Sequence, residues 1–315
     1  MRYEDIISRQ PPTIPTYAVV TPVRDEVEHF GRTAEALIAQ THRPLDWVVV
    51  DDGSTDGTRA IAEGYASQHA WIRVIDAGKR STRARGAPIV RAFSLGRESL
   101  RERPDIVVKL DADLYLPPHY FDWVARAFAH DEAAGIVGGV AYIHDGGGWV
   151  QDGAANNVNG VAKAYRSDCL DDIGGLAPSV GWDGIDEYAA RARGWRIHVL
   201  TELSILHYRP RGSRQPWYRA RWEEGRGNHY MGYLWRWLIV RAAYRMLVER
   251  PPVLGGAVLA CGFVWAHLTG APQVDDLAAR AELRREQRLR LRRLLRGARP
   301  AEGPSLPGGG PAFWS

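Results

Sequence analysis

The most constraining feature of the sequence is a β-branched run that ends in two adjacent acids. Val48, Val49 and Val50 lead directly into Asp51 and Asp52, and a Gly/Ser/Thr-rich turn follows. Valine-rich runs are typical of the buried strands of parallel sheets. Open α/β sheets bind their ligands beyond the carboxyl ends of such strands. The run therefore predicts a buried strand whose two acids lie where a ligand would bind.

The same arrangement returns where residues 106–110 lead into Asp111 and Asp113. Residues i and i+2 of an extended segment point to the same side, so these two carboxylates could share one cation. Hard divalent cations prefer oxygen ligands, and such a cation could neutralise a departing diphosphate. A single Asp-x-Asp pair is more often a solvated pair of loop acids. Two strands that both end in acids favour a nucleotide and metal site.

Strand-like and helix-like segments alternate around these acids. Such alternation predicts βαβ units, and hence an α/β fold with a mixed, mainly parallel sheet flanked by helices. Good N-cap residues at positions 54–56 predict the start of the second helix, and Pro88 predicts either a break in the third helix or a late start of it. We expect strands over 17–22, 45–50, 71–75, 106–110, 135–143 and 197–206, helices over 27–40, 55–69, 81–101 and 117–130, and a Gly/Asn-rich loop over 146–159.

The chain divides into four predicted parts by its changes of composition. Residues 1–14 form an N-terminal extension, and residues 15–215 form the catalytic domain. Residues 216–272 form an aromatic and apolar helical region, and residues 273–315 form an Arg-rich helix with a disordered tail. The formal net charge is +4, but residues 279–299 alone hold nine Arg against two Glu, which is 9 − 2 = +7. The basic character therefore belongs to the tail, and the rest of the chain is mildly acidic.

Cysteine content and the N-terminus predict a cytoplasmic protein. The two cysteines, Cys169 and Cys261, lie far apart and form no CxxC pair, which argues against a disulfide framework or a zinc site. The first residues are polar and acidic and lack the apolar core of a signal peptide.

The aromatic and apolar region predicts contact with a membrane. Residues 251–268 carry no formal charge. The length of this uncharged segment is at the lower limit for spanning a bilayer. The preceding segment mixes Trp235 and Trp237 with arginines, in the manner of an interfacial helix. Two other structures are possible for this region: a transmembrane helix, or a pair of helices buried against the catalytic domain. We expect peripheral attachment at the inner face of the plasma membrane, because the Arg-rich helix would add attraction to anionic lipid.

A third acidic cluster contains Asp183, Asp186 and Glu187. A carboxylate at a helix start could act as a general base that takes a proton from a reacting group. The structural alternative is that these acids only stabilise the N-terminus of the helix, through their interaction with the helix dipole. Among the three we rank Asp186 first as the base, then Glu187, then Asp183.

Two further features have both a functional and a structural interpretation. Arg83 and Arg85 lie between the two acidic strand ends and could bind a diphosphate, because Arg grips phosphate bidentately. They could equally be a solvated basic loop. His207 follows a strand-like run and could complete a metal shell or bind phosphate, or could simply be a packed histidine.

Residues 21–26, 48–58 and 109–113, in this order and spacing, resemble the family 2 glycosyltransferases with the GT-A fold. The resemblance covers about residues 15–210. It implies transfer of a sugar from a UDP-, GDP- or TDP-linked donor to a saccharide or lipid-linked saccharide acceptor. It further implies inversion at the anomeric carbon, assisted by Mg²⁺ or Mn²⁺, and a role in polysaccharide, lipopolysaccharide or other cell-surface glycan synthesis.

The resemblance also implies roles for individual residues. Pro22, Arg24 and Glu26 would line the nucleotide pocket, although the family often has Asn in place of Arg24. Asp51, with Asp52 beside it, would hold the base. Asp111 would contact the ribose or the metal, and Asp113 and His207 would bind the metal. Arg83 and Arg85 would bind the diphosphate. The base that takes the proton of the acceptor hydroxyl would be Asp186, Glu187 or Asp183.

Two other classes of protein remain as alternatives. A sugar-nucleotidyltransferase uses a similar sheet, but it would usually carry a Gly-rich phosphate loop after the first strand, where this chain has residues 21–26. A nucleic-acid-binding protein could use the Arg-rich tail. The acidic site argues against it, so we expect no nucleic-acid partner.

Overall fold

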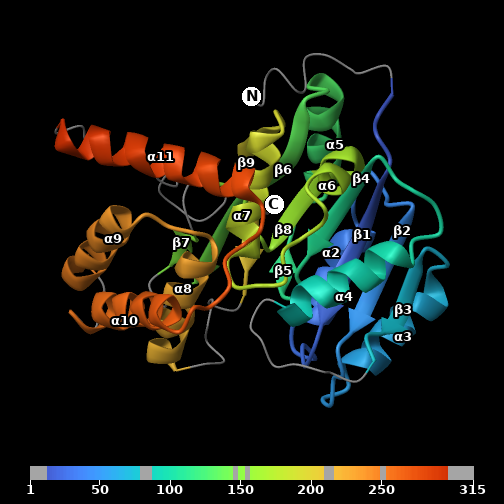
Figure 1. Cartoon of the computed structure of the whole chain (residues 1–315). Coiled ribbons are helices and arrows are strands. Elements are labelled where there is room, and N and C mark those ends of the chain that lie inside the picture. Colours follow the sequence, from blue (N-terminus) through green and yellow to red (C-terminus); the bar gives the residue numbers. More distant parts are fainter. Residues whose placement is uncertain are drawn as a thin grey trace.

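The computed structural model describes residues 13–78, 87–144, 148–152, 157–208, 216–248 and 253–296. In this part of the chain one sheet forms the centre, with strand order β3-β2-β1-β4-β8-β6-β9-β5 and with β7 paired to β6 (Figure 1). The strands are β1 (Tyr17–Val23), β2 (Asp46–Asp51), β3 (Ile72–Asp76), β4 (Ile106–Leu110), β5 (Leu114–Tyr115), β6 (Ala134–His144), β7 (Trp149–Gln151), β8 (Ala162–Arg166) and β9 (Arg196–His207).

Helices cover both faces of the sheet because its central strands are apolar on both sides. Val49 packs in one cluster with α2 and α5, whereas Val48 and Val50 pack in a second cluster with α4 and α6. This alternation is the two-residue period of a strand. The helices are α2 (Phe30–Ile38), α3 (Thr58–Gln68), α4 (Ala87–Glu98), α5 (Tyr120–His130), α6 (Ser167–Asp172) and α7 (Trp182–Ala192).

The α/β architecture expected from the sequence is confirmed, with a mixed sheet. Strands β3, β2, β1 and β4 are parallel, as are β6 and β9. Strand β8 lies between β4 and β6 and is antiparallel to both. Strand β8 therefore joins the two parallel parts of the sheet, and it lies immediately beside the second acidic strand end.

Several element boundaries differ from the sequence expectations. Helix α3 begins at Thr58 after Gly57, which has a φ of 96°, and no side chain caps it. The expected start at 55 was wrong because Asp56 instead accepts hydrogen bonds from the Thr58 backbone and hydroxyl, within the turn. The expected loop over 146–159 contains β7, and β5 was not foreseen. Helix α4 is described from Ala87, and the expected start at 81 lies outside the described residues.

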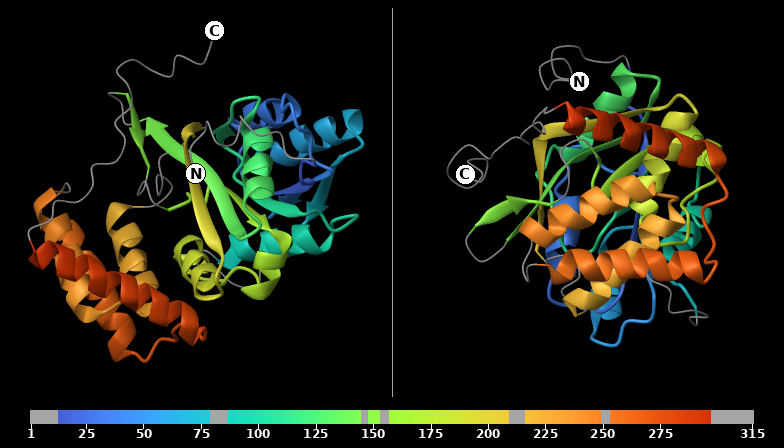
Figure 2. Two further views of the ribbon diagram at one scale, coloured as in Figure 1. Left: turned by 90° about the horizontal axis from the view of Figure 1, so that it is seen from above. Right: turned by 60° about the vertical axis from the view of Figure 1, so that its left-hand side comes forward.

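The C-terminal helices form a separate layer on one side of the sheet (Figure 2). They are α8 (Trp217–Tyr230), α9 (Trp235–Val248), α10 (Leu254–Leu268) and α11 (Leu277–Leu295). Helices α8 and α10 approach so closely that a Cβ on Gly225 would lie 2.0 Å from the Leu259 carbonyl oxygen, and a Cβ on Gly262 would lie 2.3 Å from that of Trp222. Glycine is therefore required at both positions.

Helix α11 connects this layer to the sheet domain. Its Ala279 and Leu283 pack in one cluster with Ile185 and Tyr188 of α7. The helix that carries the third acidic cluster is thus held from the C-terminal side. Among the described helices, none combines the length and apolar character needed to cross a membrane.

Candidate active site

The sheet brings the two acidic strand ends to the same edge. Strand β1 lies between β2 and β4 and is parallel to both, with Val23 paired to Asp51 and Val20 paired to Lys109. Because parallel strands end at the same edge, Asp51 and Asp111 both lie at the carboxyl edge of this part of the sheet. This is the edge at which open α/β sheets bind ligands.

Asp51 and Asp52 are both buried, and each has a defined partner. Asp51 Oδ1 accepts a hydrogen bond from the Ser54 backbone N–H at 3.0 Å, and its Oδ2 lies 3.9 Å from an Arg59 nitrogen. Asp52 Oδ1 pairs with Arg91 of α4 at 3.1 Å. Asp51 therefore shapes the turn that follows β2.

The segment after β1 packs against the same turn. Pro22 pairs with Val50 across the sheet, and the Glu26 backbone N–H donates to the Thr58 hydroxyl at 2.8 Å. Arg24 Nε lies 3.5 Å from a carboxylate oxygen of its neighbour Asp25. These contacts bring Pro22, Arg24 and Glu26 next to the Asp51 turn.

Asp25 is the residue of this segment that the sequence interpretation missed. Its φ of 52° lies in the left-handed region, where Asp is among the few tolerated side chains. Its Oδ1 accepts from the Thr55 backbone N–H at 2.8 Å, and this hydrogen bond holds the pKa of the Asp25 carboxyl below its usual range. Asp25 thus joins the two loops at the edge. An Asp before a Glu in a loop gives no sequence signal for such a role.

Asp113 and His207 face each other across β5 and β9. His207 Nε2 lies 3.3 Å from Asp113 Oδ2, and both residues are buried. Burial alone would lower the pKa of His207, but its hydrogen bond and attraction to Asp113 outweigh that effect and raise the pKa. Leu114 pairs with His207 in the sheet, and this pairing places the preceding residue, Asp113, beside His207.

Asp111 lies beside this pair and is partly exposed. Its backbone N–H donates to the Val161 carbonyl at 2.7 Å, and its Oδ1 pairs with the ammonium of Lys109. Burial raises the pKa of Asp111, Lys109 opposes that shift, and the nearby Asp113 carboxylate adds to it. Asp111 is therefore close enough to Asp113 for the two charges to interact.

The donor chemistry of these residues fits a divalent cation. Carboxylate oxygens and an imidazole nitrogen are ligands that Mn²⁺ accepts, and the buried Nδ1 atom of His207 has no hydrogen-bond partner among the residues that the structure describes. Within the described ranges no three His, Cys, Asp or Glu side chains already stand in metal-binding arrangement. Lys109 holds Asp111 in this arrangement, so Asp113 and His207 are the residues best placed to bind a metal.

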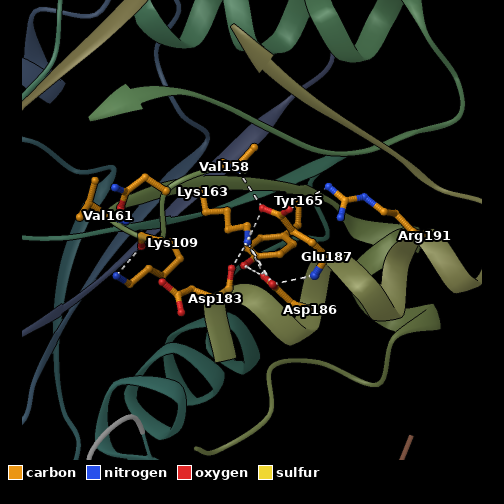
Figure 3. Close-up of polar contacts among 11 residues, drawn as sticks. Lys109, Val158, Val161, Lys163, Tyr165, Asp183, Asp186, Glu187 and Arg191 are labelled. Atoms are coloured by element: carbon orange, nitrogen blue, oxygen red, sulfur yellow. Dashed lines mark hydrogen bonds and ion pairs between the residues drawn. The ribbon is translucent and has the colours of Figure 1, made fainter. Parts of the chain in front are cut away.

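The third acidic cluster is organised by a buried lysine (Figure 3). Lys163 of β8 is fully buried, and its Nζ lies 2.9 Å from Asp186 Oδ2 and 3.1 Å from Glu187 Oε1. The same Nζ donates to the Asp183 backbone carbonyl at 2.7 Å, and the Tyr165 hydroxyl donates to Asp186 Oδ2 at 2.6 Å. Burial alone would lower the pKa of Lys163, but attraction to Asp186 and Glu187 outweighs it and raises the pKa.

The carboxylate oxygens of Asp186 and Glu187 are therefore already engaged in hydrogen bonds and ion pairs within the protein. Asp186 also accepts from the Glu187 backbone N–H at 2.7 Å. Glu187 accepts from the Val158 backbone N–H at 2.8 Å and from Arg191 at 3.1 Å. Burial raises the pKa of both carboxyl groups.

Asp183 differs from its two neighbours because its side chain is not buried. It lies against Gly160, where an added Cβ would come within 2.9 Å of the Asp183 Cβ and 3.1 Å of its Oδ2. The Gly160 carbonyl accepts from Lys109 at 2.8 Å, and Lys109 also lies 5.2 Å from the centre of the Trp182 ring. Lys109 thus contacts both the Asp111 segment and the residues around Asp183.

The two lysines are the site residues that sequence interpretation missed. Lys109 and Lys163 are among the largest fully buried side chains. A lysine inside an otherwise apolar or small-residue strand was the only available signal. Arg83 and Arg85, expected to bind diphosphate, lie outside the described residues.

A pocket of about 600 Å³ lies elsewhere, between α4, α6 and the segment before β4. It holds none of the expected site residues. On its wall, Arg97 and Arg103 pair with Asp171, and Arg103 also pairs with Asp168, so the charge of these two arginines is already matched. We therefore place the chemistry at the strand edge, where the acids gather, and not in this pocket.

Comparison with solved structures supports the fold. A mannosyltransferase, PcManGT from Pyrobaculum calidifontis, solved with GDP-Man and Mn²⁺, matches with a TM-score of 0.54. The match covers 93% of this chain and 87% of that chain at 17% identity. At this identity the likeness shows the GT-A fold alone.

Curated relatives are similar over shorter lengths. Validoxylamine A glucosyltransferase of Streptomyces hygroscopicus subsp. limoneus is 31% identical over 42% of this chain and 28% of its own length. A Bacillus subtilis protein named for teichuronic acid biosynthesis, TuaG, is 31% identical over 31% of this chain and 36% of its own length. This chain thus matches roughly a third of the length of these relatives.

The family comparison covers the part of the chain that contains the acidic strand ends. Residues 18–168 match the model for glycosyl transferase family 2. This range runs from β1 through β8 and includes Asp51, Asp111 and Asp113. Sequence match, curated relatives and fold agree: residues 18–168, slightly less than half of the chain, form a glycosyl transferase family 2 domain.

Proposed function

We propose that the protein transfers a sugar from a nucleoside-diphosphate sugar to a hydroxyl acceptor, with inversion at the anomeric carbon. The observation that carries the proposal is the grouping of Asp111, Asp113 and His207 at one edge of the sheet, where Lys109 links the Asp111 segment to Gly160 and Asp183 lies against Gly160. One side of this arrangement suits a diphosphate, and the other suits a reacting hydroxyl. The solved PcManGT complex with GDP-Man and Mn²⁺ has the same fold and supports this use of the edge.

On the donor side, Asp113 and His207 would hold Mg²⁺ or Mn²⁺, and Asp111 would bind the same ion or the ribose. A bound divalent cation supplies positive charge that stabilises the departing nucleoside diphosphate. The nucleotide would lie against Pro22, Arg24 and Glu26. Asp51 and Asp52 would fix the turn that meets its base.

On the acceptor side, we assign the base to Asp183 and not to Asp186, which the sequence ranking placed first. A general base must be within reach of the hydroxyl whose proton it takes. Asp186 and Glu187 are buried and bonded to Lys163, whereas the Asp183 side chain is partly exposed and lies beside the Asp111 segment. Asp183 would take the hydroxyl proton as the acceptor oxygen attacks the anomeric carbon and the bond to the diphosphate breaks.

The acceptor we propose is a saccharide or lipid-linked saccharide in cell-surface glycan synthesis. The similarity to a protein named for teichuronic acid biosynthesis supports this class. We also propose that the enzyme works at the inner face of the plasma membrane, where such acceptors would be reached.

The direct test is a donor screen with the purified chain. UDP-, GDP- and TDP-sugars are supplied with Mn²⁺ or Mg²⁺ and mixed saccharide acceptors, and release of nucleoside diphosphate is measured. Binding is followed separately by the rise in melting temperature, because a ligand stabilises the folded state by mass action. We expect one donor class to raise the melting temperature and to release nucleoside diphosphate.

The matched variants are Asp113→Ala at the site and Asp168→Ala on the surface. Asp168 is an exposed acid whose partner is Arg103. We expect Asp113→Ala to lose metal-dependent turnover and Asp168→Ala to keep it. Unchanged turnover and metal dependence in Asp113→Ala would overturn the metal assignment. In a separate assay with a nucleoside triphosphate and a sugar 1-phosphate, release of pyrophosphate would identify a sugar-nucleotidyltransferase.

A further inference from the structure

Helix α9 exposes an apolar stripe. Trp235, Ile239, Ala243 and Leu247 follow one another at intervals of four residues, so they lie along one side of the helix. Ile239 is 64% exposed and Leu247 is 85% exposed, and Trp235 is also exposed. Large apolar side chains gathered on one exposed face are characteristic of interaction surfaces.

Helix α10 exposes a second apolar stripe. Leu254, Cys261, Trp265 and Leu268 are all exposed, at spacings of seven, four and three residues, which place them on one side of this helix. Trp265 is 56% exposed and Leu268 is 76% exposed. The opposite side of α10 is fixed against α8 through Gly262, so the stripe cannot turn inward.

Helix α11 adds a row of positive charge beside these stripes. Figure 2 (right) shows α9, α10 and α11 lying across the same side of the molecule. The guanidinium of Arg290 lies 5.9 Å from the centre of the Trp237 ring, which joins α11 to α9. Arg288 and Arg292 of α11 are exposed. The helix holds seven Arg and two Glu, whereas α9 and α10 contain no acidic residue.

We propose that the outer side of α9 and α10, together with the exposed arginines of α11, is a docking surface for an anionic lipid bilayer. Aliphatic and tryptophan side chains beside arginines are the composition of helices that lie in the bilayer interface. Each basic residue near an anionic bilayer adds electrostatic attraction. Since the described helices are too short or too polar to span, the chain lies on the bilayer surface.

The charge pattern selects a bilayer over a protein partner. An interface with another protein would need acids or amides opposite the arginines of α11 and a shaped apolar surface opposite α9. An anionic bilayer supplies both diffuse negative charge and apolar depth along the whole length of the stripes. This surface lies on α9–α11, and it contains none of the residues assigned to glycosyl transfer.

The test measures sedimentation of the full chain with vesicles, without donor or acceptor. One set of vesicles is phosphatidylcholine alone, and the other contains phosphatidylglycerol. We expect binding to the anionic vesicles that weakens with added salt. Ile239→Ser with Leu247→Ser should weaken binding about tenfold or more, because the removed apolar surface no longer enters the bilayer. Arg288→Glu with Arg292→Glu should weaken binding to the anionic vesicles by about tenfold or more.

The control is Leu45→Ser with Ile89→Ser, which removes exposed apolar side chains from the sheet domain. It should bind vesicles as the wild type does. Equal binding by wild type and both α9 and α11 variants would overturn the proposal, as would no binding by the wild type. A wild-type dimer that Ile239→Ser with Leu247→Ser converts to a monomer, without vesicle binding, would assign the surface to a second copy. None of these outcomes depends on donor turnover, so the proposed transfer is tested separately.

Discussion

Lys109 and Lys163 lie directly opposite each other on the antiparallel strands β4 and β8. Opposite partners in a sheet point their side chains to the same face. Lys109 contacts Asp111 and the Gly160 carbonyl, whereas Lys163 contacts the Asp183 carbonyl and the acids of α7. The lysine pair therefore connects the donor-side acids to the acceptor-side acids through two neighbouring strands.

Removal of the Lys163 charge should strongly destabilise the fold. We expect Lys163→Met to lower the free energy of unfolding by about 3–5 kcal/mol, because Asp186 and Glu187 would remain buried without their cation. Urea unfolding measures the change. As a control, Arg103→Met breaks exposed ion pairs and should cost about 0–1 kcal/mol. A loss below about 1 kcal/mol for Lys163→Met would show that the acids do not depend on Lys163.

The base assignment predicts different effects for two neighbouring acids. Asp183→Asn should lower kcat for transfer by about 10²- to 10⁴-fold, because the acceptor proton would have no base. Its donor binding and melting temperature should change little. Asp186→Asn should mainly lower the melting temperature, since Asp186 pairs with Lys163 and Tyr165. If Asp186→Asn keeps its stability and loses transfer while Asp183→Asn stays active, the base is Asp186.

Gly160 should be sensitive to a single methyl group. A Cβ there would approach the Asp183 side chain to 2.9 Å, so Asp183 would have to move. We expect Gly160→Ala to lower kcat by about 10- to 100-fold, because small displacements of a reacting group are costly. Gly64→Ala is the matched control, since nothing lies within 4 Å of its added Cβ. This helix substitution should stabilise the protein by about 0.5–1 kcal/mol and leave kcat unchanged. Equal kcat values in both variants would contradict the role of Gly160.

The strands that carry the donor-side acids were predictable because their sequences are apolar. Residues 106–110 were expected as a strand, and β4 has these bounds. The expected strand at 45–50 differs from β2 by one residue at each end. Parallel pairing then places the following acids at one edge, so Asp51 and Asp111 could be grouped from sequence alone.

The ranking of the acceptor-side acids was not predictable, because it depends on β8. The sequence of this strand, Ala-Lys-Ala-Tyr-Arg, has few large apolar residues and was not expected as a strand. Its Lys163 and Tyr165 bind Asp186 and leave Asp183 accessible. Burial of a lysine depends on partners that arrive from α7, and no local pattern in the sequence records them.

A partly buried carboxylate in the C-terminal layer should make stability depend on pH. Glu224 of α8 accepts from Arg241 and Arg245 at 2.7 Å each, and from Arg221 at 2.9 Å. Burial alone would raise the pKa of Glu224, but attraction to Arg241 and Arg245 outweighs it and lowers the pKa. A lowered pKa means that the ionised carboxylate stabilises the fold above its ordinary pKa, near 4.5. That contribution is lost as the pH falls through the lowered value.

Glu224→Gln should therefore cost about 1–3 kcal/mol of unfolding free energy at pH 7, because charged hydrogen bonds are replaced by neutral ones. The difference from wild type should shrink as the pH is lowered below about 4.5, where the unfolded carboxyl binds a proton, and should be lost below the lowered pKa, where the folded carboxyl is neutral as well. Urea unfolding of both proteins at several pH values measures this. Glu63→Gln, in an exposed pair with Arg59, should show almost no difference at any pH. A Glu224→Gln difference that is equally large at low pH and at pH 7 would show that charge at Glu224 does not stabilise α8 against α9.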